Sequence, residues 1–443
     1  MSTTGLTQSQ IDIREGVQKI CAQFPDEYWA EKDSKGEYAG DLHPELAKAG
    51  YIGICMPQEY GGADLGISEA AIMMATIAES GAGIAGCQTV HANVYATIPL
   101  LKFCTRSQQA RFLPPLISGE ERTCFGVTEP DSGLDTLRLS TRAERVGAVY
   151  RVSGQKIWIT NAQASSRMVL LARTSPLDSQ AQSDSKSSSK GLTLLYADIA
   201  RGKREGSVEV RPIEKMGGRS VDANQVFFDN FEVPVSDRVG DEGDGFKIIL
   251  HGMKYVPSLP SSYHIHPLTQ IQNSAERILL SAESLGLGYA ALKRASSYAS
   301  TRVVFGRPIG QNQGIQHPLA RSWCELEAAR ALVLGVARRF DELVGVTSSS
   351  SSPSVQTKRK PTKEELIELG ASCNAAKYVA AEAAFRACEQ AVMTLGGMGY
   401  AKEYHVERYL RESFVPRIAP VSREMILNFI GQKVLGCTYY RIS

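Results

Sequence analysis

VYRVSGQKIWITN, residues 149–161, is the clearest strand signal in the chain. Its apolar residues are β-branched or aromatic, which favours a strand, and Ser153-Gly154 in its middle favours a turn. Further runs of this kind follow, separated by Gly, Asp or Pro: Met168–Leu171, Leu192–Ile199, Val208–Ile213 and Val226–Val233. Several short strands with turn signals between them predict a small antiparallel barrel or sandwich.

Helical periodicity dominates on both sides of this β-rich region. Before it, Ile67–Ala82 is rich in Ala, Ile and Met. After it come three long amphipathic stretches, Ala275–Ser300, Gln316–Leu343 and Ala371–Leu395. The order of helices, strands and a helical bundle lacks the alternation of a dinucleotide-binding sheet, and it predicts an α+β protein.

The chain has 443 residues, too many for one ordinary core. We expect an N-terminal all-α domain over residues 1–120, a middle antiparallel β domain over 121–236 and a C-terminal helical bundle over 237–443. Two Ser-rich stretches, Leu177–Lys190 and Val346–Thr362, predict a flexible loop and a disordered connector.

Composition describes an ordinary globular protein, with 43% hydrophobic residues, 22% charged residues and a formal net charge of +2. No Lys/Arg run is long enough to follow a nucleic-acid backbone, so we expect no nucleic-acid partner. The nine cysteines are scattered without zinc spacing, which predicts reduced thiols and no metal site. No apolar run reaches the roughly 18 residues of a membrane span. We therefore expect a soluble intracellular protein.

Two segments of the β region could carry chemistry. Cys124–Thr136 is a strand that enters a Pro/Gly turn, where backbone N–H groups and a hydroxyl can hold a pyrophosphate or the polar edge of a ring. The alternative is a plain β-turn. Gly154–Asn161 places Trp158 beside Thr160, and an indole there can cover a planar cofactor. The alternative is a core Trp with a polar cap.

A third segment, Arg302–Gly310, is followed by Gln313. A guanidinium ahead of a Gly-rich turn suits a pyrophosphate, and the alternative is a surface salt bridge. Gly286–Ala291 matches a dinucleotide-binding pattern, but it lies inside a helical run, so we expect close helix packing there instead. His264 and His266 have no carboxylate nearby and predict no metal.

Taken together, these segments resemble the acyl-CoA dehydrogenase family in order and spacing. The matching residues are Thr128-Glu129-Pro130 with Gly133 and Asp135, Gly154-Gln155-Lys156 with Trp158 to Asn161, Arg302 with Phe305-Gly306, and Gly396-Gly397-Met398-Gly399-Tyr400. Tyr60-Gly61-Gly62 and Leu113-Pro114-Pro115-Leu116 fit as well. The resemblance covers nearly the whole chain. It implies that the C-terminal domain is a four-helix bundle and that FAD lies between it and the β domain.

The resemblance also implies which residues bind FAD. Thr128, Trp158 and Thr160 would face the flavin ring. A second group would reach the FAD of a neighbouring subunit: Arg302, Phe305, Gln313, Gly396 and Gly397. A cofactor shared in this way implies a homodimer or homotetramer. Leu134 stands where the family often has Ser, and Met393 replaces a Gln, so FAD binding would rest more on backbone groups.

Dehydrogenation needs a base that takes the α proton while a hydride leaves the β carbon for flavin N5. Many family members place this Glu in a Tyr-Glu-Gly-Thr segment, which corresponds here to Ala419–Ser422. Pro420 occupies the Glu position and has neither a carboxylate nor an N–H. Glu424, one helical turn later, is a poor substitute.

A second family solution places the base in a Glu-Arg pair at the start of the first bundle helix. That pair is Glu276-Arg277 here, similar to the isovaleryl-CoA and long-chain branches. We predict that Glu276 is the catalytic base. The alternative is a solvated Glu that stabilises a helix N-terminus.

Lys254–Asn273 has no counterpart in the family; it contains three prolines and no periodicity. We hypothesise that it is a translated intron, because its ends can be encoded with splice donor and acceptor sequences. A mature transcript that always retains it would contradict this hypothesis. If the protein carries the segment, Glu276 could be displaced, and a shift of about 1 Å can cost about 10²-fold in rate.

The resemblance implies an FAD-dependent acyl-CoA dehydrogenase that forms the trans-2-enoyl-CoA and passes electrons to an electron-transfer flavoprotein. It also implies a mitochondrial or peroxisomal location. One alternative is a tailoring dehydrogenase of a specialised acyl chain. The other is a catalytically impaired FAD-binding paralogue, which the loss of the usual Glu suggests.

Overall fold

The computed structural model describes residues 1–133, 136–175, 191–249, 274–344 and 361–437. Leu134, the expected flexible loop 177–190, the anomalous segment 254–273 and residues 346–360 of the expected connector lie outside the described residues. Thr362, the last residue of that connector, instead caps the following helix by accepting a hydrogen bond from the Glu365 N–H at 3.2 Å.

The N-terminal region is helical, as predicted. Its elements are α1 (Gln8–Cys21), α2 (Asp26–Lys35), α3 (Leu42–Lys48), η1 (Gln58–Tyr60), α4 (Ile67–Ile77), η2 (Ala78–Ala82), α5 (Gly83–Gln88), α6 (His91–Tyr95), α7 (Ile98–Phe103) and α8 (Arg106–Ile117). The single helix expected over residues 67–82 is wrong in its last turn. It widens into the π-helical η2, where Gly81 takes a φ of +110° that favours glycine.

The middle region forms one sheet whose strand order is β6-β7-β3-β2-β4-β5-β8, with β1 paired to β4. Its elements are β1 (Thr123–Gly126), η3 (Thr136–Arg138), β2 (Arg142–Val146), β3 (Val149–Thr160), β4 (Arg167–Arg173), β5 (Leu192–Asp198), α10 (Ile199–Glu205), β6 (Val208–Pro212), β7 (Ala223–Pro234), η5 (Val235–Asp237) and β8 (Arg238–Val239). The pairings are antiparallel, as predicted, except that β4 pairs parallel with β1 and briefly with β2. Strand β8 lies beyond the expected domain boundary at residue 236.

The turn expected at Ser153-Gly154 is wrong, because β3 runs unbroken through it. The pairing of β3 with β7 shifts register between Val152 and Gly154, which marks a β-bulge. Gly154 has a φ of +145°, and a Cβ there would overlap the backbone of Thr141. Glycine therefore serves a bulge and a close approach of two strands.

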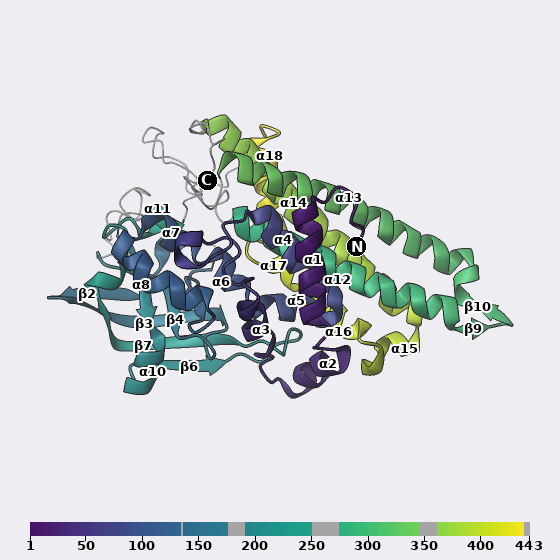
Figure 1. Cartoon of the computed structure of the whole chain (residues 1–443), viewed down its shortest axis with the longest axis horizontal. Helices are drawn as coiled ribbons and strands as arrows, with labels where there is room; N and C mark the ends of the chain where they lie inside the picture. Colours follow the sequence, from purple (N-terminus) through teal and green to yellow (C-terminus); the bar gives the residue numbers. More distant parts are fainter. Residues whose placement is uncertain (134–135, 176–190, 250–273, 345–360, 438–443) are drawn as a thin grey trace, which may run out of the picture.

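The C-terminal region is dominated by three long helices that correspond to the three predicted stretches (Figure 1). Its elements are α11 (Gly245–Ile249), α12 (Ser274–Thr301), β9 (Val303–Val304), β10 (Arg307–Pro308), η6 (Ile309–Gln311), α13 (Gln313–Leu343), α14 (Lys363–Leu395), α15 (Gly397–Tyr400), η7 (Lys402–Tyr404), α16 (Val406–Glu412), α17 (Val415–Ile418) and α18 (Arg423–Lys433). The shorter α16 and α18 pack against α14.

The glycines of Gly286–Ala291 pack helices together, as predicted. Both lie inside α12. A Cβ on Gly286 would overlap the carbonyl oxygen of Ala75 in α4, and one on Gly288 would crowd Leu326 of α13 and the backbone of Ala384 in α14. Helix α12 therefore approaches its neighbours at van der Waals distance, without a nucleotide between them.

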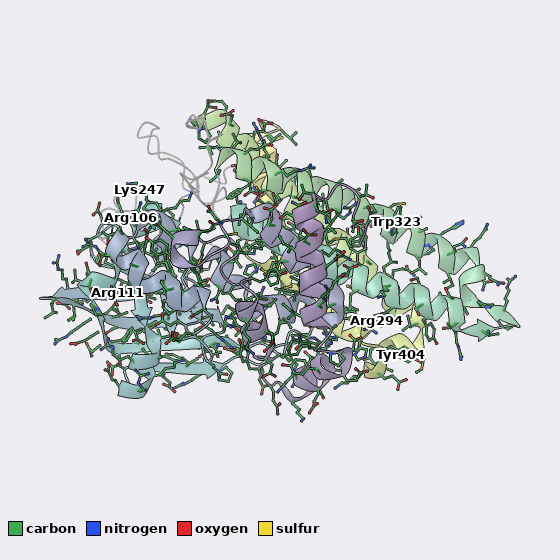
Figure 2. All side chains as sticks on the ribbon, in the orientation of Figure 1. Arg106, Arg111, Lys247, Arg294, Trp323 and Tyr404 are labelled. Atoms are coloured by element: carbon green, nitrogen blue, oxygen red, sulfur yellow. The ribbon has the colours of Figure 1, made fainter. Side chains whose placement is uncertain are left out.

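One hydrophobic core joins the N-terminal helices to the bundle, with buried residues from α1, α4, α12, α13 and α14. At the periphery, Arg294 of α12 (labelled in Figure 2) pairs with Asp26 of α2 and donates to the Tyr409 hydroxyl of α16. On the other side, Phe112 of α8 packs on Tyr196 of β5, with ring centroids 4.7 Å apart. The N-terminal helices thus contact both the sheet and the bundle.

Candidate active site

A cavity of about 340 Å³ lies where the three regions meet. The N-terminal region, the sheet and the bundle each contribute to its wall, and four predicted site residues line it: Thr128, Trp158, Thr160 and Glu276. A second cleft of about 860 Å³, between α7, α8, β8 and α11, contains none of the predicted site residues. We therefore place the candidate active site at the smaller cavity.

Thr128 is held in place by a buried ion pair formed by its sequence neighbour Glu129. The Lys156 ammonium donates to Glu129 Oε1 at 2.8 Å and to the Val127 carbonyl at 3.0 Å, so it binds the residues on both sides of Thr128. The Thr128 carbonyl also accepts the Ile157 N–H at 2.9 Å. Since Lys156 lies two residues before Trp158, the pair fixes both cavity-lining segments to each other.

The Glu129 carboxylate also accepts the backbone N–H groups of Ser140 and Thr141, at 2.7 and 3.0 Å. Burial on its own would raise the pKa of Glu129, but the Lys156 charge and these donors outweigh it and lower the pKa to about 2. Sequence reasoning quoted Glu129 and Lys156 inside the motifs and gave them no role. Glu129 follows β1 in a turn and Lys156 lies in a strand with other polar residues, so neither stood out in the sequence.

Trp158 is not the core residue of the alternative interpretation, because 57% of it is exposed. A register shift in β3 between Lys156 and Ile159 turns it out of the strand, and its φ is +62°. A bulky residue in the left-handed region is an outlier that points to a functional constraint. The indole therefore lies at the cavity wall, beside Thr160.

Glu276 lies in the first turn of α12, on the wall formed by the bundle. The side chain is buried, and its Oε2 has no hydrogen-bond partner among the described residues. The alternative of a solvated first-turn Glu is therefore wrong, since the carboxylate faces the cavity. A buried carboxylate oxygen without a hydrogen-bond donor lowers stability unless a ligand donates to it or a proton binds it.

His91 of α6 lies between Glu276 and a second buried carboxylate, Glu283 of α12. Its Nδ1 hydrogen-bonds Glu283 Oε1, and its Nε2 lies 3.9 Å from Glu276 Oε1. Burial on its own would lower the pKa of His91, but the two carboxylates outweigh it and raise the pKa to about 10. Sequence reasoning missed both residues, because neither belongs to a local motif.

Behind Glu276, the buried Arg277 and Asn374 lack hydrogen-bond partners within the described residues: all three guanidinium nitrogens and both amide atoms are unpaired. Burial lowers the pKa of Arg277 to about 10. Burial also lowers the pKa of Lys377 to about 7, and its ammonium donates to the Val421 carbonyl at 2.6 Å. Cationic groups therefore lie on the bundle side of the base.

The two other base positions weighed from the sequence differ in placement. Pro420 lines the cavity and brings no carboxylate to it. Glu424 lies on α18, where it is exposed and pairs with Arg423. It does not line the cavity.

Comparison with known families matches all three regions. The acyl-CoA dehydrogenase N-terminal domain matches residues 7–120, the middle domain residues 124–231 and the C-terminal domain residues 269–435. The chain belongs to the acyl-CoA dehydrogenase family. It is thus an FAD-dependent oxidoreductase that acts on the CH–CH bond of an acyl-CoA, as predicted.

Individual relatives resemble this acyl-CoA dehydrogenase over nearly its full length. FadE12 of Mycobacterium tuberculosis is 30% identical over 424 residues, which cover 96% of this chain and 95% of that protein. The structure of butyryl-CoA dehydrogenase from Megasphaera elsdenii superposes with a TM-score of 0.80 at 26% identity, covering 98% of this chain and 100% of that one. A structure from a study of the electron transferring flavoprotein of Acidaminococcus fermentans gives the same values. The relatives include both bacterial proteins and mitochondrial plant proteins, so the comparison does not assign a mitochondrial or peroxisomal location to this chain.

The cavity of this acyl-CoA dehydrogenase fits the flavin of the family. The exposed Trp158 indole offers a flat surface, and the polar groups beside it include the Thr136 hydroxyl, which is buried without a partner among the described residues. A ring with an aromatic face and polar edges satisfies both kinds of group. These residues would hold FAD, which accepts the hydride when it is bound.

The second predicted group does not reach the cavity of its own chain. Arg302, Phe305 and Gln313 lie around the β9–β10 hairpin, at the end of the bundle furthest from the sheet (Figure 1). Gly396 and Gly397 lie at the C-terminal end of α14. All five are exposed, Phe305 by 99%.

The described residues contain one apolar segment long enough to cross a membrane, Ile67–Gln88, and 89% of its most apolar 18-residue window is buried inside the protein. The segment comprises α4, η2 and α5, which pack against α12. It therefore belongs to the protein core. No group of three or more His, Cys, Asp or Glu suited to a metal occurs in the described part of the chain, and His264 and His266 lie outside it.

Proposed function

We propose that Glu276 is the base that removes the α proton of the acyl thioester. The observation that carries this proposal is that Glu276 is the one carboxylate among the described residues that line the cavity. Thr128 and Trp158 belong to the sheet side of the cavity, and Glu276 belongs to the bundle side. A substrate between them would present its α carbon to Glu276 and its β carbon to the flavin.

Each side of the cavity has one task in this reaction. Thr128, Trp158 and Thr160 would hold and orient the flavin ring, and bound FAD would supply the hydride acceptor. Glu276 takes the α proton, and the thioester carbonyl beside it makes that proton acidic enough for a carboxylate. Because Pro420 has no N–H, the carbonyl oxygen needs another donor than the backbone of residue 420.

The test is anaerobic flavin bleaching by butyryl-, isovaleryl- and palmitoyl-CoA. We expect Glu276→Gln to bind FAD normally and to reduce it at least 10²-fold more slowly, about the contribution of a general base. Glu424→Gln is the matched control and should bleach like the wild type. Unchanged bleaching in Glu276→Gln would place the base elsewhere. A wild-type protein that none of the thioesters bleaches would support the impaired-paralogue alternative.

We also propose that the exposed group around Arg302 and Gly396 completes the FAD site of a second copy. These residues resemble the family's FAD-binding residues and yet lie far from their own cavity. A homodimer or homotetramer in which the bundle end of one chain reaches the cavity of another reconciles both facts. The exposed Phe305 would then be buried between subunits.

An electron-transfer flavoprotein is the proposed electron acceptor. The structural neighbour from the Acidaminococcus fermentans study supports this partner, since that work concerns an electron transferring flavoprotein. Transfer of electrons from acyl-CoA to this partner, measured with purified components, tests the proposal. Rapid reoxidation by oxygen with release of peroxide, and none by the flavoprotein, would indicate an oxidase.

A tailoring role on a specialised acyl chain is a second candidate. The observation that favours it is the cavity wall at Ala419–Val421, where Pro420 departs from the usual family segment. A substrate with a polar group near the thioester would bleach the flavin faster than the simple acyl-CoAs above. Faster bleaching by butyryl- or palmitoyl-CoA would count against it.

A further inference from the structure

The proposed base has a buried, charged neighbourhood that family membership does not assign. His91 lies between Glu276 and Glu283, and the exposed fractions of the three side chains are 6%, 11% and 0%. Glu283 also accepts a hydrogen bond from the Gln88 side chain at 3.3 Å. Helices α6 and α12 thus bring one imidazole and two carboxylates together at the cavity.

The imidazole is positively charged in this arrangement. An isolated buried His would be neutral, because burial disfavours the charged form. Here a carboxylate hydrogen-bonds Nδ1 and another lies near Nε2, so the charged form is favoured. With both carboxylates ionised, the three groups would carry one net negative charge.

Other titratable groups surround these three. Tyr95 of α6 and Cys87 of α5 stay neutral, because burial and the nearby carboxylates raise their pKa values. Arg277 of α12 and Lys377 of α14 act on Glu276 from the bundle side. All of these residues are retained in the His91 variants, although Tyr95 packs on the His91 ring with centroids 4.8 Å apart.

We propose that His91, held by Glu283, is a positioning residue that keeps Glu276 ionised and aimed at the substrate, and so sets the pH range of α-proton abstraction. This inference rests on the proposed role of Glu276. A cation within about 4–6 Å favours a carboxylate over its neutral acid. Without it, burial and the charge of Glu283 would both favour protonation of Glu276.

Glu283 balances the charge of His91 after the proton has been transferred. In the reaction the α C–H bond breaks and its proton goes to a Glu276 oxygen, while the β hydrogen leaves with its electron pair for the flavin and the α C–H pair forms the double bond. Glu276 becomes neutral, and His91 keeps its own proton. Because Glu283 remains as a counter-ion, no unpaired buried cation is left after the step, which would be costly.

A merely structural His91–Glu283 pair would join α6 to α12 and nothing more. The two interpretations differ in the signs of their effects on the pH profile. Removing the cation disfavours ionised Glu276, whereas removing the Glu283 anion favours it. A structural role predicts that both substitutions reduce stability without moving the profile.

The experiment measures the rate of anaerobic flavin bleaching from pH 5 to pH 9, with whichever of butyryl-, isovaleryl- and palmitoyl-CoA reacts fastest. The acid limb is the pH range over which the rate falls as the pH is lowered. We expect the acid limb of His91→Gln to lie about one pH unit or more above that of the wild type. We expect the acid limb of Glu283→Gln to lie below that of the wild type. His43→Gln is the matched control, because His43 is equally buried, lies outside the cavity and has a pKa lowered to about 3 by burial. Its acid limb should stay in place.

His91→Gln alone leaves Glu283 as an unpaired buried anion and could fail to fold. The double variant His91→Gln/Glu283→Gln keeps two hydrogen-bonding amides there, and its acid limb should lie between those of the wild type and His91→Gln. If the acid limbs of these variants coincide with that of the wild type, His91 does not set the pH range of proton abstraction. The inference would then be overturned, and Glu276 would remain the proposed base. Normal bleaching in Glu276→Gln would instead overturn the proposed base, and this inference with it.

Discussion

At the scale of single residues, Lys156 connects the two segments of the β-rich region that line the cavity. Its side chain is fully buried, and Glu129 is 3% exposed. A pair of this kind needs both partners, since either one alone would be an uncompensated charge in the protein interior. In the proposed site, binding of the cofactor would therefore depend on an ion pair that lies behind the cavity wall.

We expect Glu129→Gln to lower the free energy of unfolding by about 3–5 kcal/mol at neutral pH, because Lys156 would stay buried without its counter-ion. The midpoint of urea unfolding, followed by tryptophan fluorescence, measures the loss. Glu232→Gln is the control: its pair with Arg151 is about half exposed on both sides, so its loss should stay below about 1 kcal/mol. Equal midpoints for the two variants would show that Lys156 is otherwise satisfied.

Single residues also show where prediction from the sequence ends. Thr128, Trp158, Thr160 and Glu276 were predicted separately and meet at one cavity, because each belongs to a motif with recognisable neighbours. His91 and Glu283 are 192 positions apart and have no such context. Only the packing of α6 on α12 brings them together, and local sequence does not encode that contact.

The helices and strands were predicted more completely than the π-helical turn and the β-bulges within them. The long helices and the main strands follow from periodicity, whereas the π-helical η2 and the two bulges of β3 depend on tertiary contacts. The bulge next to Trp158 is the one that places a predicted site residue at the cavity wall. The expected four-helix bundle is built from three long helices and several short ones, since the chain after α14 breaks at Gly396.

Gly286 and Gly335 offer a matched comparison between two helix glycines. We expect Gly286→Ala to destabilise the protein by about 1–3 kcal/mol, because its methyl group would overlap α4. Gly335→Ala in α13 meets open space and should stabilise by up to about 1 kcal/mol. Thermal unfolding of both variants measures the difference. A Gly286→Ala protein as stable as the wild type would mean that α4 and α12 are free to separate.

At the scale of the whole molecule, the cavity lies where the three regions meet, and the β9–β10 hairpin forms the end of the bundle furthest from the sheet (Figure 1). The three family matches leave residues 232–268 uncovered, which includes most of the anomalous segment 254–273. Its origin as a translated intron stays a hypothesis. The expected boundaries at residues 120 and 236 likewise stay predictions.

The proposed oligomer can be tested with Arg302→Ala. Because Arg302 is exposed in the single chain, we expect no change in its folding and a loss of FAD during purification. Flavin absorbance per chain measures the loss, and light scattering measures the mass of the assembly. Full flavin retention in a protein that runs as a monomer would contradict the shared site.

The distance between the cavity and the β9–β10 hairpin has a genetic consequence. A chain with Glu276→Gln keeps an intact hairpin, and a chain with Arg302→Ala keeps an intact cavity. In a mixed dimer, one of the two sites would combine the intact cavity with the intact hairpin, and it would turn over substrate. Two inactive alleles should therefore complement each other when they are co-expressed, although neither supports growth or dye reduction alone.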